Sequence, residues 1–177
     1  MKTWIASIGL AALLLLSACG PDEAALPKPL EPDEQSVAYF CNMNLTEHDG
    51  PKGQAFVRGR DKPYWFASAG EAFTFLETEL HAHELLVLYV NDVGQGGWEH
   101  PAPGAWIEIH KANFVIGGNI PTAMEEDGPG AVPFSDRAAA EAYAKKIGGT
   151  VVDFDAAAKA LSVDHPHAGD HGDEHAS

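Results

Sequence analysis

Cysteine is scarce in this chain, which has 2 among its 177 residues. The first, Cys19, ends the stretch LSAC, which follows Lys2 and the short apolar run WIASIGLAALLLL. That run is shorter than the roughly 20 residues of a membrane-spanning helix, and such a segment is typical of a bacterial lipoprotein signal. We expect residues 1–18 to be a removable signal peptide and Cys19 to carry lipid. An uncleaved anchor helix is the alternative.

Acylation of Cys19 would leave one thiol in the mature chain, at Cys41. An intramolecular disulfide is then excluded, although an exported compartment would permit one. An unpaired cysteine in such a protein indicates a reactive thiol, intermolecular pairing or a small buried core residue.

Basic residues are also few, with 11 Lys and Arg against 26 Asp and Glu and a formal net charge of −15. Binding of nucleic acid requires a positive surface, so we exclude nucleic acid as a partner. A negative field raises the local concentration of cations, and solubility is the alternative explanation of this charge.

The two ends of the mature chain lack apolar periodicity. Residues 19–36 are rich in proline and carboxylates, so we expect a lipidated, flexible tether. Residues 164–177 are expected to be disordered, and their histidines are candidate weak ligands for divalent metals, with a solvated tail as the alternative. These histidines are His165, His167, His171 and His175.

The remaining chain repeats one pattern, first in residues 37–112 and again in residues 113–163. FASAGEAF, from Phe66, corresponds to FSDRAAAEAY, from Phe134, and each stretch lies between β-rich segments. Ser68 and Asp136 are expected to cap helices, and Gly148 to end the second helix. We therefore predict an α+β fold of two small homologous strand-helix-strand units packed together, although common elements can also recur by chance.

Two further segments support strands in the first unit. LLVLYV, from Leu85, is a continuous apolar run, as expected for an interior strand. GQGGWEHPAPGAWIEI, from Gly94, is either a hairpin connection or the wall of a ligand site, and it leads into an alternating pattern. In a strand through WIEIH, Glu108 and His110 would share one side.

The stretch YFCNMNLTEHDGPKGQ, from Tyr39, contains the remaining thiol. In an extended segment, residues i and i+2 point to the same face, so the sulfurs of Cys41 and Met43 can converge on one ion. Thiolate and thioether form a soft donor set that selects Cu(I), whereas zinc sites rarely use methionine. Packing of both side chains in a core is the alternative.

A third donor would strengthen this metal site. Met124 lies in the polar loop GGNIPTAMEEDGPGAVPF, where a methionine is not obviously part of a core. His48 is the competing ligand, and its alternative role is that of a turn residue before Asp49-Gly50-Pro51.

Three of these stretches, YFCNMNLTEHDGPKGQ, YVNDV and VPFSDRAAAEAYA, closely resemble the NosL family of copper-binding lipoproteins, accessory proteins for nitrous oxide reductase. The resemblance extends from Val37 to Phe154. It implies that Cys41 and Met43 are copper(I) ligands and that Met124 is similar to a further ligand. It also implies two homologous α+β domains, with a fold similar to that of the organomercurial lyase MerB. The tail after residue 163 is an addition to the family pattern.

The resemblance implies a copper(I) metallochaperone and not an enzyme. Such a protein would supply the copper-sulfur cluster assembly route of nitrous oxide reductase together with the NosDFY membrane transporter. Its lipid would hold it to a membrane, facing the periplasm, and Gly20 slightly favours the outer membrane because aspartate there usually signals inner-membrane retention. The alternatives are a divalent-metal buffer using the histidine tail and a thiol enzyme of the organomercurial-lyase type, which would need a second thiol near Cys41.

Overall fold

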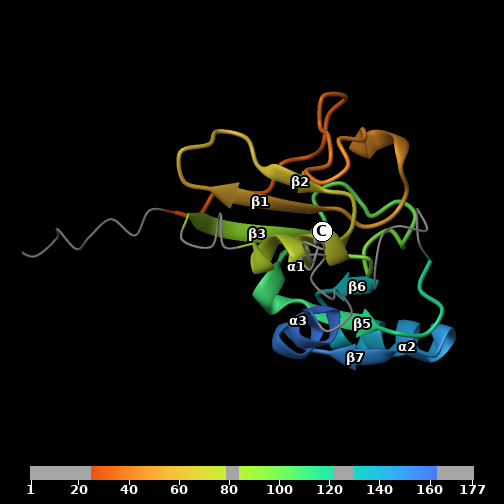
Figure 1. Ribbon diagram of the computed structural model, residues 1–177. Coiled ribbons are helices and arrows are strands. Elements are labelled where there is room, and N and C mark those ends of the chain that lie inside the picture. Colours follow the sequence, from red (N-terminus) through yellow and green to blue (C-terminus); the bar gives the residue numbers. More distant parts are fainter. Residues whose placement is uncertain (1–24, 79–83, 122–129, 163–177) are drawn as a thin grey trace, which may run out of the picture.

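The computed structural model describes residues 25–78, 84–121 and 130–162, which form two antiparallel sheets with associated helices (Figure 1). The predicted signal peptide, Cys19, Met124 and the tail histidines lie outside the described residues. Within the described residues, no helix combines the length and apolar character needed to cross a membrane.

The first sheet has the strand order β2-β1-β3-β4. Its strands are β1 (Gly53–Val57), β2 (Tyr64–Phe66), β3 (Leu85–Asn91) and β4 (Trp106–Glu108). The apolar run in β3 lies between β1 and β4, which confirms the prediction of an interior strand. Helix α1 (Ala69–Glu77) connects β2 to β3, and the Ser68 side chain accepts the Glu71 N–H at 3.1 Å, as predicted for its cap.

The second sheet has the strand order β6-β5-β7. Its strands are β5 (Asn113–Ile116), β6 (Ala131–Phe134) and β7 (Thr150–Val152). Helix α2 (Arg137–Ile147) connects β6 to β7. The Asp136 carboxylate accepts N–H groups of its first turn, and Gly148 ends it with φ of 77°, a left-handed conformation that suits glycine. Both caps were predicted.

The two sheets follow the same plan. In each sheet the first strand is central, the second and third strands flank it, and a helix connects those two flanking strands. The repeated phenylalanines occupy equivalent positions, because Phe66 is opposite Gly53 and Phe134 is opposite Asn113 at the start of each central strand. The predicted α+β fold is therefore confirmed.

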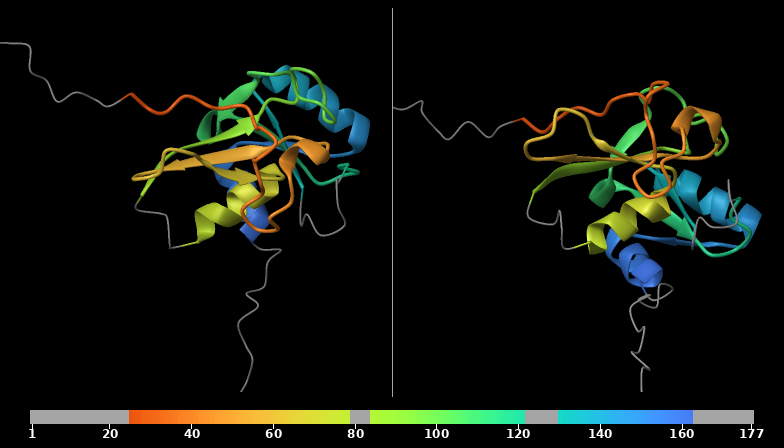
Figure 2. Two further views of the ribbon diagram at one scale, coloured as in Figure 1. Left: turned by 90° about the horizontal axis from the view of Figure 1, so that it is seen from above. Right: turned by 45° about the horizontal axis from the view of Figure 1, so that its top comes forward.

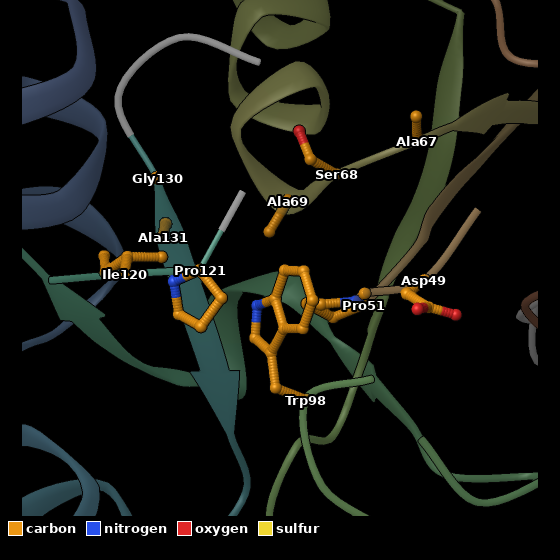
Figure 3. Close-up of a pocket in the computed structure, with 11 residues that line it drawn as sticks. Asp49, Pro51, Ala67, Ser68, Ala69, Trp98, Ile120, Pro121, Gly130 and Ala131 are labelled. Atoms are coloured by element: carbon orange, nitrogen blue, oxygen red, sulfur yellow. The ribbon is translucent and has the colours of Figure 1, made fainter. Parts of the chain in front are cut away.

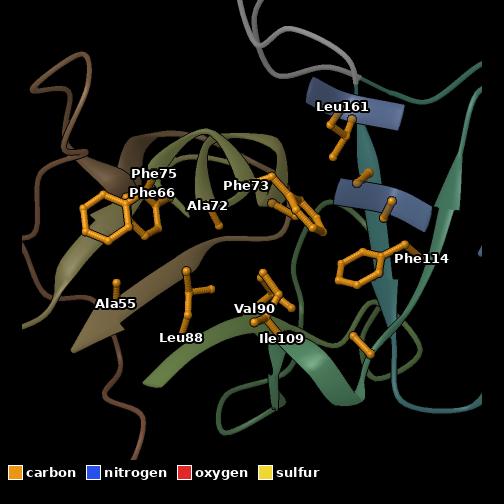
Figure 4. Close-up of a cluster of buried hydrophobic side chains, with 14 of the residues drawn as sticks. Ala55, Phe66, Ala72, Phe73, Phe75, Leu88, Val90, Ile109, Phe114 and Leu161 are labelled. Atoms are coloured by element: carbon orange, nitrogen blue, oxygen red, sulfur yellow. The ribbon is translucent and has the colours of Figure 1, made fainter. Parts of the chain in front are cut away.

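A continuous apolar core joins the two sheets (Figure 4). Phe73 of α1 meets Phe114 of β5 edge to face, with ring centroids 5.0 Å apart. A third helix, α3 (Phe154–Ser162), packs against α1 and adds Leu161 to this core. Helix α3 was not predicted from the sequence, although Asp153, which accepts the Ala156 N–H at 2.9 Å, provides an N-cap signal.

The predicted strand through WIEIH is only partly correct. Strand β4 ends at Glu108, and the next three residues form the 3-10 helix η2 (Ile109–Lys111). The Glu108 carboxylate accepts the His110 N–H at 3.2 Å and lies 2.5 Å from Nδ1 of the same residue. Because this local hydrogen bonding satisfies the first turn of η2, it competes with extension of the strand.

Residues 27–35, which we call the strap, cross the first sheet (Figure 2). Composition predicted a flexible tether here, but hydrogen bonds hold the strap on the sheet. The amide of the fully buried Gln54 exchanges two hydrogen bonds with the Leu30 backbone, each 2.9 Å long. Tyr89 donates to the Pro27 carbonyl, and Glu31 accepts the Trp106 indole N–H, both at 2.8 Å. These hydrogen bonds to the sheet fix the conformation of the strap, which its own sequence would not do.

Candidate metal-binding site

Cys41 lies in the turn of a short hairpin, Ser36–Leu45, which we call the Cys41 hairpin. Its two arms pair at an isolated antiparallel bridge, and the peptide groups nearest the turn are hydrogen-bonded across it. The backbone bonds are Ala38 N–H to Met43 O at 2.9 Å, Asn42 N–H to Ala38 O at 2.9 Å and Leu45 N–H to Ser36 O at 3.0 Å. The turn that carries Cys41 is therefore closed by its own main chain.

The Cys41 hairpin encloses the edge strand β2 from both faces. On the face of the sheet that packs against α1, the Tyr39 ring makes edge contacts with Tyr64 and Phe75, at centroid distances of 4.9 and 5.5 Å. On the outer face, Ala38 and Leu45 are buried against Trp65. The Tyr39 N–H also donates to the Trp65 carbonyl at 2.8 Å. Apolar contacts on both faces thus fix the base of the hairpin and leave its turn projecting.

Asn42, between the two sulfur residues, has φ of 56° and is the one described non-glycine residue with positive φ. Asparagine tolerates this left-handed conformation better than most residues. The backbone through Cys41, Asn42 and Met43 is therefore not extended, and the premise on which the sequence analysis placed both sulfurs on one face is wrong.

Cys41 is exposed and Met43 is half-buried. Neither residue belongs to the apolar clusters of the core, which contradicts the alternative that both pack there. Two trans peptide units separate their Cα atoms, so these atoms lie within about 7.6 Å of each other. A thiol and a thioether on one short, closed turn provide the soft donor pair that Cu(I) prefers.

His48 lies at the end of the 3-10 helix η1 (Leu45–Glu47), which the Asn44 side chain caps. Its side chain is half-buried, and its backbone N–H donates to the Leu45 carbonyl at 3.5 Å. The predicted reversal follows, with Gly50 at φ of 95° and the Trp98 ring packed against it. Thus His48 has the turn position proposed as the alternative to a ligand role.

A small pocket adjoins this reversal, and we call it the Trp98 pocket (Figure 3). The Trp98 ring lies between Pro51 and Pro121, and Gly130 lines the same pocket. Pro121 and Gly130 are the described residues on either side of 122–129, the stretch that contains Met124. The loop from Gly94 is thus both a connection between paired strands β3 and β4 and a wall of a pocket.

The Trp98 pocket and the Cys41 hairpin adjoin the same short stretch of chain. Phe40, next to Cys41, has its ring 6.3 Å from that of Phe66, and Ala67 and Ser68 line the pocket. Pro121 and Gly130, which flank the Met124 segment, therefore lie on the side of the first sheet where Phe66 leads into α1. Among the described residues, no group of three or more His, Cys, Asp or Glu side chains is arranged to hold a metal.

The buried carboxylate of Asp92 was not singled out from sequence. Burial alone would raise the pKa of Asp92, but hydrogen bonds outweigh burial and lower it below its usual value. The donors are the Ser135 hydroxyl, the Gln95 amide at 2.9 Å, and the N–H groups of Gly94 at 2.9 Å and Ser135 at 3.2 Å. Asp92 therefore fastens the end of β3 to the entry of α2. It lies away from the Cys41 hairpin in the chain and has a structural role.

Comparison with known proteins decides the family. Residues 29–162 match the sequence model of the family described as NosL. The chain belongs to the NosL family. The match includes the Cys41 hairpin, both sheets and all three α-helices.

Three relatives agree with this assignment to NosL. The chain is 39% identical to the copper-binding lipoprotein NosL of Achromobacter cycloclastes, over 80% of this chain and 74% of that protein. It is 32% identical to the copper-binding lipoprotein NosL of Stutzerimonas stutzeri, over 88% of this chain and 83% of that protein. The crystal structure of the copper chaperone NosL from Shewanella denitrificans superposes with a TM-score of 0.66 at 31% identity, covering 73% of this chain and 95% of that one.

Proposed function

We propose that this NosL chain binds copper(I) through Cys41 and Met43 and passes the ion to an acceptor protein. The observation that carries the proposal is an exposed thiol, with a thioether two residues further along the chain, in the closed turn of the Cys41 hairpin. The relatives are named as copper-binding lipoproteins and as a copper chaperone, which supports a binding role and not an enzymatic one.

The donor chemistry favours the cuprous ion. Thiolate and thioether are soft ligands, and a site that uses them selects Cu(I) over harder divalent ions. Cys41 binds as the thiolate, so loading releases one proton and weakens in acid. In transfer, an acceptor thiol loses its proton and binds the copper, the bond to Cys41 breaks, and Cys41 regains a proton. Copper remains cuprous throughout, so no electron donor or acceptor is needed.

Met124 is the proposed third ligand, and His48 is its competitor. Support for Met124 comes from the flanking residues Pro121 and Gly130, which line the Trp98 pocket beside the Phe66–Ser68 stretch that Phe40 contacts. His48 has a turn role of its own, which leaves Met124 the better candidate. The affinities of Met124→Leu and His48→Ala variants for Cu(I) separate the two, since only the true ligand's variant should bind more weakly.

The proposed cellular setting combines the lipid anchor with the family's role. Cys19 carries the lipid, and the protein faces the periplasm from a bacterial membrane, with the outer membrane slightly favoured. The proposed acceptor is the assembly route of the copper-sulfur cluster of nitrous oxide reductase, together with the NosDFY transporter. Support comes from membership of NosL and from the relatives' description as lipoproteins.

Anaerobic Cu(I) titration against a competing chelator tests the site. Relative to the unmodified chain, Cys41→Ser should lower the affinity on the order of a hundredfold or more, since it removes the charged soft ligand. A chain that ends at Val163 should keep the tight site and lose only weak divalent binding. An unchanged affinity in Cys41→Ser, or loss of the tight site with the tail, would contradict the proposal and favour the divalent-metal buffer.

A further inference from the structure

Exposed cations gather in the turn between β1 and β2. Arg58, Arg60 and Lys62 are all exposed there, with Asp61 among them. None of the three forms an ion pair with any other described residue. The chain has 26 acidic and 11 basic residues, so a cluster of cations outside any ion pair is an unusual local feature.

Two of these cations, Arg60 and Lys62, border the Cys41 hairpin. Arg60, Lys62 and Tyr64 line one side of a surface groove, and Tyr39 and Asn42 line another part of it. We call it the Arg60 groove. Asn42 is the direct neighbour of Cys41 in the chain, so the groove extends to the turn that carries the thiol.

The Arg60 guanidinium is held in place within the groove. Its Cζ atom lies 4.0 Å from the centroid of the Tyr64 ring, and its Nε–H donates to the Lys62 carbonyl at 3.4 Å. The Tyr64 ring in turn contacts Tyr39, two residues before Cys41. An arginine stacked on an aromatic ring loses less freedom when it binds a carboxylate, so the groove is prepared for such a contact.

The acidic residue that lines the groove is already engaged. The Asp33 carboxylate accepts the Ser36 hydroxyl at 2.8 Å and the Gln35 N–H at 3.0 Å. These two bonds, with a smaller contribution from Lys62, lower the pKa of Asp33. Because its oxygens accept hydrogen bonds within the strap, Asp33 forms no ion pair with Arg60 or Lys62, although its negative charge still acts on Lys62.

An exposed aromatic ring completes this surface. Phe40, which directly precedes Cys41, is 41% exposed although its ring contacts Tyr39 and Phe66. Aromatic side chains and arginine are enriched at the centres of protein interfaces, which suits Phe40 and Arg60 to a docking surface.

We propose that the Arg60 groove and Phe40 dock the copper acceptor, and that this acceptor carries Asp or Glu side chains around its copper-receiving thiols. The inference rests on the proposed copper transfer from Cys41. The local positive charge attracts and orients an acidic face, even though the whole chain is negative. Such complementarity acts mainly on the rate of association and on the orientation of the partners.

Model acceptors of known charge test this proposal. The copper-loaded full-length lipoprotein, in nonionic detergent and without oxygen, is mixed with one of two peptides. Both peptides carry the same Cys-x-x-Cys thiol pair, flanked by glutamates in one and by lysines in the other. The ratio of the two transfer rates is compared between the unmodified chain and Arg60→Glu/Lys62→Glu. The rate of transfer to the glutamate peptide, divided by the rate to the lysine peptide, should fall on the order of tenfold in this variant. The difference in this ratio between the variant and the unmodified chain should vanish in high salt.

Lys145→Glu/Lys146→Glu is the matched control, because it makes the same change of charge in the last turn of α2 on the second sheet. It should change the ratio less than twofold. Equal ratios in the two double variants, or an unchanged ratio in Arg60→Glu/Lys62→Glu, would overturn the proposal. A variant that lost only binding to vesicles of anionic lipid would assign the groove to the membrane and also overturn it.

Chelator competition keeps this inference separate from the proposed function. Both double variants should bind Cu(I) as tightly as the unmodified chain, since neither alters Cys41 or Met43. Transfer to neither peptide by the unmodified chain would count against copper transfer itself. Phe40→Ser provides a second variant of the docking surface, and it should slow transfer to both peptides without changing affinity.

Discussion

Asn42 is the residue on which the shape of the turn in the Cys41 hairpin depends. Its left-handed backbone allows the chain to reverse between Cys41 and Met43 while its N–H bonds to the Ala38 carbonyl. The two sulfur donors were recognisable from sequence because their chemistry is a property of residue type. Their arrangement was not, since a single backbone angle at Asn42 separates a turn from an extended segment.

Substitution of Asn42 tests this view of the turn. Asn42→Ala should lower the free energy of unfolding by about 1 kcal/mol, because an alanine pays a steric cost at positive φ. It should also weaken Cu(I) binding, as the two donors lose their fixed relation. Asn42→Gly should keep the stability nearly unchanged. Urea unfolding and chelator competition measure both effects, and equal behaviour of the two variants would show that the left-handed conformation is unimportant.

Buried polar residues show the same limit of sequence reasoning. Gln54 and Asp92 are buried within the described structure, yet their partners, Leu30 and Ser135, lie 24 and 43 residues away along the chain. The partner of Gln54 is distant in the chain, and Asp92 combines its distant partner with local hydrogen bonds from Gly94 and Gln95. Hydrogen bonds between residues far apart in the sequence can be identified only in the folded structure. The caps at Ser68 and Asp136 were predictable because the N–H groups that they accept are adjacent in the chain.

Among the elements, the strap departs most from its predicted structure. Proline and acidic residues gave it no apolar period, and its order comes from bonds to Gln54, Tyr89 and Trp106 on three strands. Helix α3 was missed for a related reason, because its short alanine-rich sequence follows directly on a strand. The helices α1 and α2 and the interior strand β3 were predicted because each contains its own cap or apolar run.

Removal of the Gln54 amide should release the strap. Gln54→Ala leaves the Leu30 N–H and carbonyl without partners, so the free energy of unfolding should fall by about 1–3 kcal/mol. Hydrogen exchange at the Leu30 amide should become fast, while exchange in the second sheet keeps its rate. Gln35→Ala is the control, since that side chain is exposed. Continued protection of the Leu30 amide in Gln54→Ala would show that other contacts hold the strap.

At the scale of the whole molecule, the two sheets share an apolar core and are also joined by polar contacts. Phe73 and Phe114 join the sheets through apolar contact, and Asp92 joins the end of β3 to Ser135 before α2. The sequence predicted two similar units, and their repeated pattern made that possible. The contacts between the units have no repeat and leave no periodic signal in the sequence.

A shared core predicts a single unfolding transition. Phe114→Ala should lower the free energy of unfolding by about 3–5 kcal/mol, the usual cost of removing a buried aromatic ring. Both sheets should then lose amide protection at the same, lower urea concentration. A second sheet that unfolds while the first keeps its protection would show that the two units are independent.

The Asp92 carboxylate predicts a dependence of stability on pH. Its pKa is lowered in the folded state, so its stabilisation is complete above its unfolded pKa, about 3.9. That stabilisation is lost as the pH falls through the lower folded pKa. Asp92→Asn should therefore be less stable at neutral pH, and its stability should decline less than that of the unmodified chain between about pH 4 and 2. Parallel declines in urea titrations would exclude Asp92 as the source.

The docked strap also limits how far the domain can travel from its lipid. If Cys19 is the acylated residue, eight peptide units separate it from Pro27, where the Tyr89 hydroxyl holds the backbone. Eight peptide units can span at most roughly 30 Å even when fully stretched. The lipid then keeps the domain close to the membrane. In the proposed copper delivery, the protein would find its acceptor by two-dimensional diffusion along the membrane surface.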